Sequence, residues 1–463
     1  MEIKKKTEVP LEVTGIAFGG RGIAKVDGYT IFIDGAVPGD TVLARILKKK
    51  KSYAEARAIE VISPSADRVD PPCRYSGHCG GCRWQYLVYD RQLEYKRQHV
   101  VEALERIGQL SGIPVHETLP SERIFGYRNK MEFSCSDHRW LLPEELGDPG
   151  IDTDFALGLH VPGTFDKILD IDECHLHPEQ GNRILNAVRK YMKSSGMPPY
   201  AQRAYEGFWR FLMLRHSVAH DQWLVNVITA ADAPDVLGPL ATQLMADHPN
   251  IAGVVNNVTG RKASVAVGER EILVAGESYL KEKLGPFEFE VSANSFFQTN
   301  TRGAEKIYET VRRYAELSGT ETVLDLYSGT GTIPIWLSRD AGTVTGIEIV
   351  ESAVADAVRN CRNNGIDNCE FITGDIRESI GSITRKPDVL IIDPPRVGMH
   401  KDVVAAVQDM AAARVVYVSC NPATLARDLA LLAEDYEIVE VQPIDMFPHT
   451  FHIESVAKLE KRK

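Results

Sequence analysis

The sequence lacks any long hydrophobic run. No uninterrupted apolar stretch approaches the ~20 residues that a membrane-spanning helix needs, and residues 1–10 are charged and hold no apolar core of a signal peptide. We therefore expect neither a membrane protein nor a secreted one, but a cytoplasmic chain. Because disulfides are not expected there, the eight cysteines need another explanation, namely burial, a metal site or catalysis.

The sequence also lacks an excess of positive charge. Its formal net charge is -11 over 463 residues, and its apolar fraction of 44% is ordinary for a globular protein, which at this length predicts about three domains. Positive charge gathers near the start, where residues 1–62 hold eleven Lys and Arg against eight Asp and Glu. A solvated charge run and a nucleic-acid surface both explain this cluster.

Residues 6–62 predict five short strands separated by glycine turns. Asp27-Gly28, between two apolar runs, is a strong hairpin signal. Strands of this number and size predict a small OB-like β-barrel, a fold that often binds nucleic acid. The stretch GIAFGGRGIAKVDGYTIFIDGAVPGD resembles a TRAM domain, an RNA-binding barrel of RNA-modifying enzymes. We assign residues 1–64 to this barrel.

Three cysteines follow a proline-rich linker, and a fourth lies far along the chain. Cys73, Cys79 and Cys82 share a glycine-containing loop, and Cys174 stands in Asp-Glu-Cys-His. Zinc and an iron–sulfur cluster both prefer four thiolates, and buried unliganded thiols are the third alternative. The C-x3-C-x2-C spacing of radical enzymes that cleave S-adenosylmethionine is absent, which argues against methylthiolation of RNA.

A central α+β domain is predicted over residues 65–295. Residues 83–110 predict a helix that ends at Gly108. Beyond it, apolar–polar alternation predicts a mainly antiparallel sheet, with helices at 179–193 and 233–247. Residues 135–154 are polar and predict a surface loop.

From residue 296 to 463, strands and helices alternate, which predicts an α/β Rossmann-like domain. Asn300 or Thr301 can cap its first helix. A strand then enters the glycine loop Asp325-Leu-Tyr-Ser-Gly-Thr-Gly331. The third glycine of a dinucleotide fingerprint is missing, and the loop matches the D-x-x-x-G-x-G pattern of S-adenosylmethionine methyltransferases.

Two acidic residues follow this loop at strand ends. Glu348 ends the second strand, where a carboxylate suits the hydroxyls of a ribose. Asp375 ends the third strand and either reaches the adenine amine or caps a loop. Cys361 falls on the apolar face of the helix between them, so we expect it in the core.

A thiol and two acids follow the last strands. Asp393-Pro394-Pro395 is followed by Arg396, not by the aromatic residue usual in amine-methylating enzymes. Cys420 ends the fifth strand, and thiolate addition at carbon 6 is what methylation of a pyrimidine at carbon 5 needs. We expect the pKa of Cys420 to fall in an electropositive cleft. Glu454 and His452 are candidate bases, with a surface carboxylate and a packed imidazole as the alternatives.

Together these motifs resemble the RNA uracil-5-methyltransferases, specifically the ribosomal RNA type with a TRAM domain and a [4Fe-4S] cluster. The resemblance rests on C73-x5-C-x2-C with Cys174, F297QTN, DLYSGTG, GIE, DPPR, SCNP and HIESV. It implies Cys420 as the nucleophile and Glu454 as the base. It also implies four residues that contact the cofactor, to which we add Asp375: Gln298, Tyr327, Glu348 and Asp393. The cluster ligands that it implies are Cys73, Cys79, Cys82 and Cys174.

The resemblance also implies a substrate and a way of working. It favours a uridine of ribosomal RNA, 23S rRNA in the first place, held in a loop or unstacked, with no DNA and no membrane involved. Phe296 or Phe297 would stack on RNA. A transfer RNA substrate is the alternative, and an inert RNA-binding module is the alternative of another class. We expect a monomer.

Overall fold

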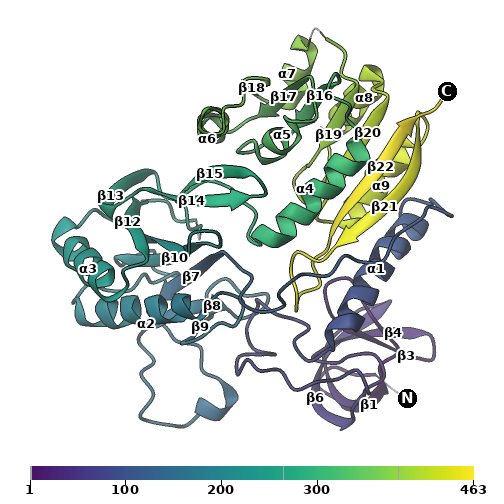
Figure 1. Ribbon diagram of the computed structural model, residues 1–463. Coiled ribbons are helices and arrows are strands. Elements are labelled where there is room, and N and C mark those ends of the chain that lie inside the picture. The colour runs from purple at the N-terminus through teal and green to yellow at the C-terminus, as the bar shows by residue number, and fades with distance from the viewer. Residues whose placement is uncertain (1–2, 264, 384) are drawn as a thin grey trace.

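The computed structural model describes residues 3–263, 265–383 and 385–463 and has three lobes (Figure 1). The N-terminal lobe is a six-stranded sheet with the order β1-β5-β6-β4-β3-β2, in which β4 and β6 are parallel. The predicted hairpin joins β3 and β4 through Asp27 and Gly28, both with positive φ. The first of the five expected strands forms two strands in the structure, β1 and β2. The strands are β1 (Glu8–Glu12), β2 (Gly15–Ile16), β3 (Gly22–Val26), β4 (Tyr29–Asp34), β5 (Thr41–Lys49) and β6 (Tyr53–Ser63).

The helix expected over residues 83–110 is shorter than predicted. It is α1 (Tyr89–Arg106), because residues 83–88 form turns that pack Trp84 and Leu87 into a small apolar cluster. The buried side of α1 contacts α9 (Pro422–Leu432) and shares a core with the C-terminal sheet. The sequence of residues 83–110 mixes basic and apolar positions and does not reveal where the helix begins, because tertiary packing stabilises the turns at residues 83–88.

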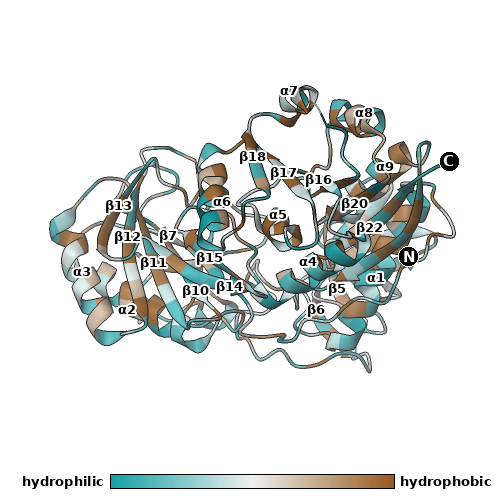
Figure 2. Cartoon of the chain, turned by 45° about the horizontal axis from the view of Figure 1, so that its top comes forward, coloured by the Kyte–Doolittle hydropathy of each residue, from teal (hydrophilic) through white to brown (hydrophobic). Residues whose placement is uncertain are grey.

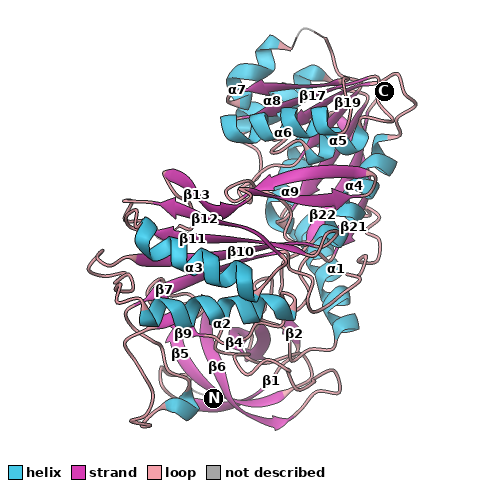
Figure 3. Cartoon of the chain, turned by 60° about the vertical axis from the view of Figure 1, so that its left-hand side comes forward, coloured by secondary structure: helices cyan, strands magenta, loops and turns pink. Residues whose placement is uncertain are grey.

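The central lobe is a seven-stranded sheet with the order β13-β12-β11-β10-β7-β8-β9. Only β11 and β12 are parallel, which confirms the mainly antiparallel expectation. Both predicted helices are present, and Figure 3 shows α2 and α3 together over the sheet. The elements are β7 (Lys130–Ser136), η1 (Pro143–Glu145), β8 (Ala156–His160), β9 (Ile168–Asp170), α2 (Glu179–Ser194), β10 (Trp209–Ser217), β11 (Gln222–Thr229), α3 (Pro234–Asp247), β12 (Ile251–Val258) and β13 (Arg270–Gly276).

A separate hairpin, β14 (Tyr279–Leu284) with β15 (Phe287–Ser292), leads from the central lobe into α4 (Thr301–Ala315). Asn300 caps α4, because its Oδ1 accepts the N–H of Gly303 at 3.0 Å, so the first of the two expected caps is confirmed.

The C-terminal lobe is a seven-stranded sheet with the order β18-β17-β16-β19-β20-β22-β21. Its first five strands are parallel, and β22 is antiparallel to both neighbours. Strand order reverses between β16 and β19, which is where ligands bind in such sheets. The central strand β19 (VLII) is wholly apolar and buried, and the neighbouring β20 is nearly so, as expected for strands covered on both faces, whereas β18 and β21 carry more polar residues (Figure 2).

The bounds of the C-terminal elements follow the predicted alternation. They are β16 (Thr322–Leu326), α5 (Thr332–Leu337), β17 (Thr343–Glu348), α6 (Glu351–Asn363), β18 (Cys369–Thr373), α7 (Ile376–Ser379), η2 (Ile380–Ser382), β19 (Val389–Ile392), α8 (Lys401–Met410), β20 (Arg414–Ser419), α9, β21 (Tyr436–Ile444) and β22 (Glu454–Lys461). Cys361 is buried in the core, as expected. None of the described helices is long and apolar enough to span a membrane.

Candidate active site

The ends of three adjacent strands bring three reactive side chains to one edge of the C-terminal sheet. Asp393 follows β19 and Cys420 follows β20, both at carboxyl ends of parallel strands. Glu454 begins β22, and the antiparallel pairing of Ser419 with Ser455 sets it beside the end of β20. The charges of Glu454 and Asp393 both act on the Cys420 thiol, so the three groups form one site.

Cys420 is partly buried at the junction of β20 and α9. Asn421 caps α9 through its Oδ1, which accepts the N–H of Ala423 at 3.1 Å. Its side-chain amide donates to the carbonyl oxygen of Arg396 at 3.1 Å, and the Thr424 hydroxyl donates to the same oxygen at 3.3 Å. These contacts hold the Asp-Pro-Pro-Arg segment against the loop that carries the thiol.

The pKa of Cys420 is raised in the chain without a ligand, and its fall in an electropositive cleft stays a prediction for the cofactor-bound state. Burial raises this pKa to about 11, and the carboxylates of Glu454 and Asp393 raise it as well. Arg396 acts in the opposite direction. The sequence names these three residues but does not show that the charges of both acids act on the thiol.

Glu454 is buried, and its pKa lies well above the ordinary value. Burial is the main cause, Asp393 adds to it, and Arg396 opposes it. Burial likewise raises the pKa of Asp393 to about 7. A carboxyl with a raised pKa in a closed site is the usual environment of an acid–base catalyst. His452, the other candidate, has its pKa lowered to about 4 by burial, and its ring lies 4.2 Å from that of Phe451.

Asp325, the first residue of the glycine-loop motif, is a further candidate for cofactor binding. It lies on β16, is almost fully buried, and neither carboxylate oxygen has a hydrogen-bond partner among the described residues. Burial raises its pKa well above the ordinary value, and the charges of Asp393 and Glu348 add to the shift. An unpaired buried carboxyl is costly unless a ligand completes it. The acidic first position of the glycine-loop pattern was the available signal.

The glycine loop is folded back over the ends of β16 and β17. The N–H groups of Tyr327 and Ser328 donate to the carbonyl of Ile347 at 3.1 and 3.0 Å. Glu348 accepts the N–H of Gly329 at 2.9 Å and that of Val350 at 2.8 Å. Tyr327 has a φ of 71°, a strained conformation for a residue with a side chain.

The segment that precedes α4 is hydrogen-bonded to this loop at Phe296. The Thr330 hydroxyl donates to the carbonyl of Phe296 at 3.2 Å, so the segment that carries Gln298 is tied to the glycine loop. Phe297 is buried in the core, whereas the Phe296 side chain is 67% exposed. Of the two aromatic residues, only Phe296 is therefore free to contact RNA.

Asp375 is a helix cap in this structure. Its Oδ1 accepts the N–H of Arg377 at 2.9 Å, and both carboxylate oxygens bind the Arg377 guanidinium. These bonds lower its pKa to about 2. Adenine recognition by Asp375 would have to compete with this ion pair.

An S-adenosylmethionine molecule fits the charges around the glycine loop. It carries an ammonium and a sulfonium, and Asp325 offers a buried carboxyl without a partner. Glu348 stands at the end of the adjacent strand, where a ribose would lie. The donor set of the described residues therefore suits this cofactor.

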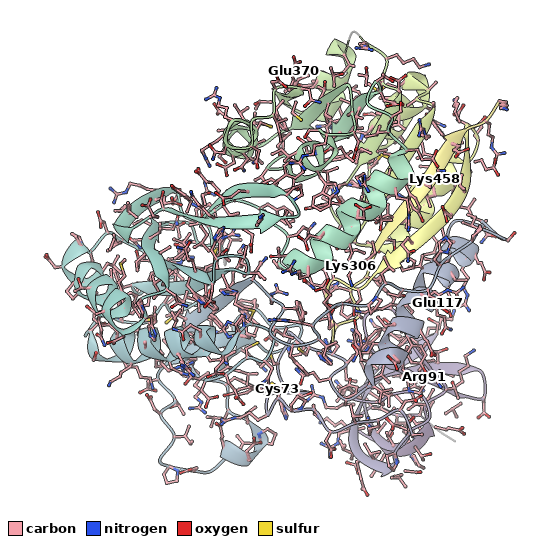
Figure 4. The ribbon with its side chains drawn as sticks, viewed as in Figure 1. Cys73, Arg91, Glu117, Lys306, Glu370 and Lys458 are labelled. Carbon is pink, nitrogen blue, oxygen red and sulfur yellow. The ribbon has the colours of Figure 1, made fainter. Side chains whose placement is uncertain are left out.

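The four predicted cluster cysteines gather where the central lobe meets the rest of the chain, as the position of Cys73 in Figure 4 shows. They contact the core of the central lobe. Burial raises the pKa of all four thiols, to about 12 for Cys79 and about 11 for Cys174, and the charges of neighbouring cysteines raise that of Cys82 further. We call Cys73, Cys79, Cys82 and Cys174 the four-cysteine site.

Polar groups around this site oppose the effect of burial on the thiols. The N–H of Gly81 donates to Cys79 Sγ at 3.3 Å. Backbone N–H groups lower the pKa of Cys73 and Cys174, and the Gln85 side chain lowers that of Cys82. Such donors stabilise thiolates and are typical around iron–sulfur clusters. Within the described residues, however, no three His, Cys, Asp or Glu side chains form a group that could hold a metal ion.

Two families of known sequences match parts of this chain. One is described as tRNA (Uracil-5-)-methyltransferase and matches residues 265–462, and the other is the TRAM domain, which matches residues 4–59. An uncharacterised RNA methyltransferase of Chlorobaculum tepidum is 43% identical over 94% of this chain and 92% of its own length. One of Porphyromonas gingivalis is 39% identical over 97% of this chain and 99% of its own.

A solved structure has the same architecture. It is the Pyrococcus abyssi tRNA (uracil-54, C5)-methyltransferase in complex with S-adenosyl-L-homocysteine. This chain is 29% identical to it, with a TM-score of 0.76 over 97% of this chain and all of that one. The expected fold, a TRAM barrel joined to a methyltransferase domain, is thereby confirmed.

Proposed function

The chain belongs to the RNA methyltransferases of the uracil-5 family, and we propose that it methylates carbon 5 of a uridine through a covalent adduct with Cys420. One observation carries this proposal, namely that Asp393, Cys420 and Glu454 meet at one edge of the sheet beside the glycine loop. Attack at an amine needs no thiol, whereas attack through a pyrimidine ring carbon does.

In the proposed reaction, Cys420 and Glu454 each carry out a chemical step. The Cys420 thiolate forms a bond to carbon 6 of uracil, which makes carbon 5 nucleophilic. S-adenosylmethionine, when bound, would supply the methyl group of its sulfonium to carbon 5, with its own methyl–sulfur bond breaking and the thioether S-adenosylhomocysteine leaving. Glu454 then removes the proton of carbon 5, the carbon–sulfur bond breaks, and Cys420 leaves as a thiolate.

Cys420 and Glu454 both act in their deprotonated forms, which their raised pKa values disfavour. Burial raises the pKa of both Cys420 and Glu454 when no ligand is bound. Both pKa values fall when positive charge enters the site, as the effect of Arg396 already shows. We propose that Gln298, Tyr327, Glu348 and Asp393, together with Asp325, hold the cofactor, with Asp375 at the adenine end.

We propose that the four-cysteine site holds a [4Fe-4S] cluster. Its support is the set of four neighbouring thiols, of which Cys79 Sγ accepts the N–H of Gly81 and the other three have their pKa lowered by nearby polar groups. Iron and acid-labile sulfide content of the full chain, purified without oxygen, tests this proposal.

The resemblance of the sequence motifs is the support for ribosomal RNA, which is the substrate that we propose, and transfer RNA is the second candidate. The TRAM barrel supports an RNA substrate but does not distinguish the two. The Pyrococcus protein acts on tRNA and matches this chain over its whole length, barrel included, which favours the second candidate.

Mapping of 5-methyluridine separates these candidates. Ribosomal and transfer RNA from a strain without this gene should each be incubated with the purified chain and labelled S-adenosylmethionine. Label that appears as 5-methyluridine in ribosomal RNA supports the first substrate, and label in transfer RNA supports the second. Absence of methyl transfer to both RNAs would point to an inert RNA-binding module.

A further inference from the structure

A hydrogen-bonded link leads from the four-cysteine site to the segment that ends in Glu454. The two residues after Cys82, Arg83 and Trp84, donate their backbone N–H groups to the carbonyl oxygen of His449 at 2.9 and 3.0 Å. The N–H of His449 in turn donates to Gln92 Oε1 at 2.8 Å. His449 is buried and has a φ of 65°, so this turn depends on its surroundings.

A second link leads from the four-cysteine site to residues 298–301. The carbonyl groups of the two residues after Cys174 accept the N–H groups of Gly126 and Arg128, both at 2.8 Å. The next residue, Asn129, donates its backbone N–H to the carbonyl of Thr299 at 2.8 Å.

The Asn129 side chain completes this second link. Its amide donates to the carbonyl of Gln298 and to the hydroxyl of Thr301, each at 2.9 Å. Asn129 is buried, so these bonds do not compete with water. The segment that carries Gln298 is thereby held from the central lobe as well as from the glycine loop.

We infer that the four-cysteine site is the anchor that positions two active-site segments, residues 447–454 and residues 298–301. Asn129 is the positioning residue of the second segment. The consequences for catalysis rest on the proposed uridine methylation, and the joining of the cysteines rests on the proposed cluster.

The physical reason is that residues 298–300 and 447–453 belong to no helix or strand. Hydrogen bonds of the two links hold part of their backbone instead. Groups that act on a reacting atom must be held to within about 0.5 Å, which requires rigid support. Joining Cys174 to the Cys73–Cys82 loop ties distant parts of the chain together and removes freedom from both links.

Hydrogen exchange of the full chain, purified without oxygen, tests the anchor. In Cys82→Ala, the amides of 83–84, 126–129 and 447–452 should exchange at least about tenfold faster, while those of β10, β11 and β12 keep their rates. Cys135→Ala is the matched control, because Cys135 is a buried cysteine of the same lobe outside the four-cysteine site. Unchanged exchange in these segments, or an equal rise in β10, β11 and β12, would overturn the inference.

A second variant tests the positioning role without touching a cysteine. In Asn129→Ala, the Kd for S-adenosylhomocysteine without RNA should rise about tenfold, and the KM for the cofactor should rise with little change in the KM for RNA. Asn256→Ala is the control, because its amide makes the same two kinds of bond, to the carbonyl of Val227 and to the hydroxyl of Thr229.

Equal effects of the two asparagine variants on cofactor binding would show a general loss of stability and would refute the positioning role. Hydrogen exchange and cofactor binding both proceed without RNA. A failure of the uridine proposal would therefore leave these two results standing, and the two failures can be told apart.

Discussion

The chain holds two groups of partly or fully buried thiols, and their neighbours differ in sign. Around Cys420 the carboxyls of Glu454 and Asp393 raise the pKa of the thiol, and Arg396 opposes them. In the four-cysteine site the N–H of Gly81 donates to Cys79 Sγ, and backbone groups lower the pKa of Cys73 and Cys174. Burial raises the pKa in both places, so burial alone does not separate the two kinds of thiol. Their polar partners differ, because hydrogen-bond donors favour a thiolate whereas nearby carboxylates favour a thiol.

Removal of the nucleophile should have the largest effect. We expect Cys420→Ala to lower methyl transfer at least about a thousandfold, since the covalent step is lost, while S-adenosylhomocysteine binding stays within about twofold. Labelled methyl transfer and calorimetry measure the two quantities. Cys361→Ala, at a buried cysteine of the same lobe, serves as the control. Near-normal activity of Cys420→Ala would contradict the covalent mechanism.

Removal of the base should leave the adduct in place. In Glu454→Gln the rate should fall about 10²–10⁴-fold, and an RNA–protein adduct should accumulate because the proton of carbon 5 is no longer removed. A denaturing gel detects this species, and the same gel with Cys420→Ala should lack it. Rapid and complete turnover by Glu454→Gln would exclude Glu454 as the base.

Arg396 lowers the pKa of Cys420, whereas the acids Glu454 and Asp393 raise it. In Arg396→Gln the pKa values of Cys420 and Glu454 should both rise. We expect kcat at neutral pH to fall about tenfold, as for a shift of one pKa unit, and activity to recover partly at higher pH. A pH–rate profile of both proteins measures this. A profile that keeps its midpoint would show that Arg396 acts on RNA binding instead.

The smallest effect concerns stability. The pKa of Asp393 is about 7 in the folded chain against ~3.9 in an unfolded one. A raised carboxyl pKa contributes stability that is fully present below pH ~4 and is lost as the pH rises through about 7. Asp393→Asn should therefore flatten the decline of Tm between pH 4 and 7.

Asp375→Asn is the control for this measurement, because the pKa of Asp375 is lowered to about 2. Its contribution is present above pH ~4 and is lost only as the pH falls toward 2, so the window between pH 4 and 7 should not change. If the slope of Tm against pH is unaltered in Asp393→Asn, other groups cause the decline of Tm between pH 4 and 7.

Much of the fold could be predicted, because its signals are local. The hairpin at Asp27-Gly28, the two central helices and the Asn300 cap all follow from short stretches of sequence. The start of α1 could not, because residues 83–88 turn only where they meet the barrel and His449. Burial of the Asp325 and Glu454 carboxyls was equally hidden, since it comes from elements far away in the chain.

The sequence by itself determined which chemistry the chain carries and placed Glu348, Asp393 and Cys420 at strand ends. It could do so because parallel strands joined by helices put their carboxyl ends at the same edge. Only the tertiary structure decided how Glu454 reaches that edge, through the antiparallel pairing of β22 with β20. The same holds for the raised pKa values and for the links from the cysteines to residues 298–301 and 447–454. Pairing and burial join residues far apart in the chain, and no local pattern encodes them.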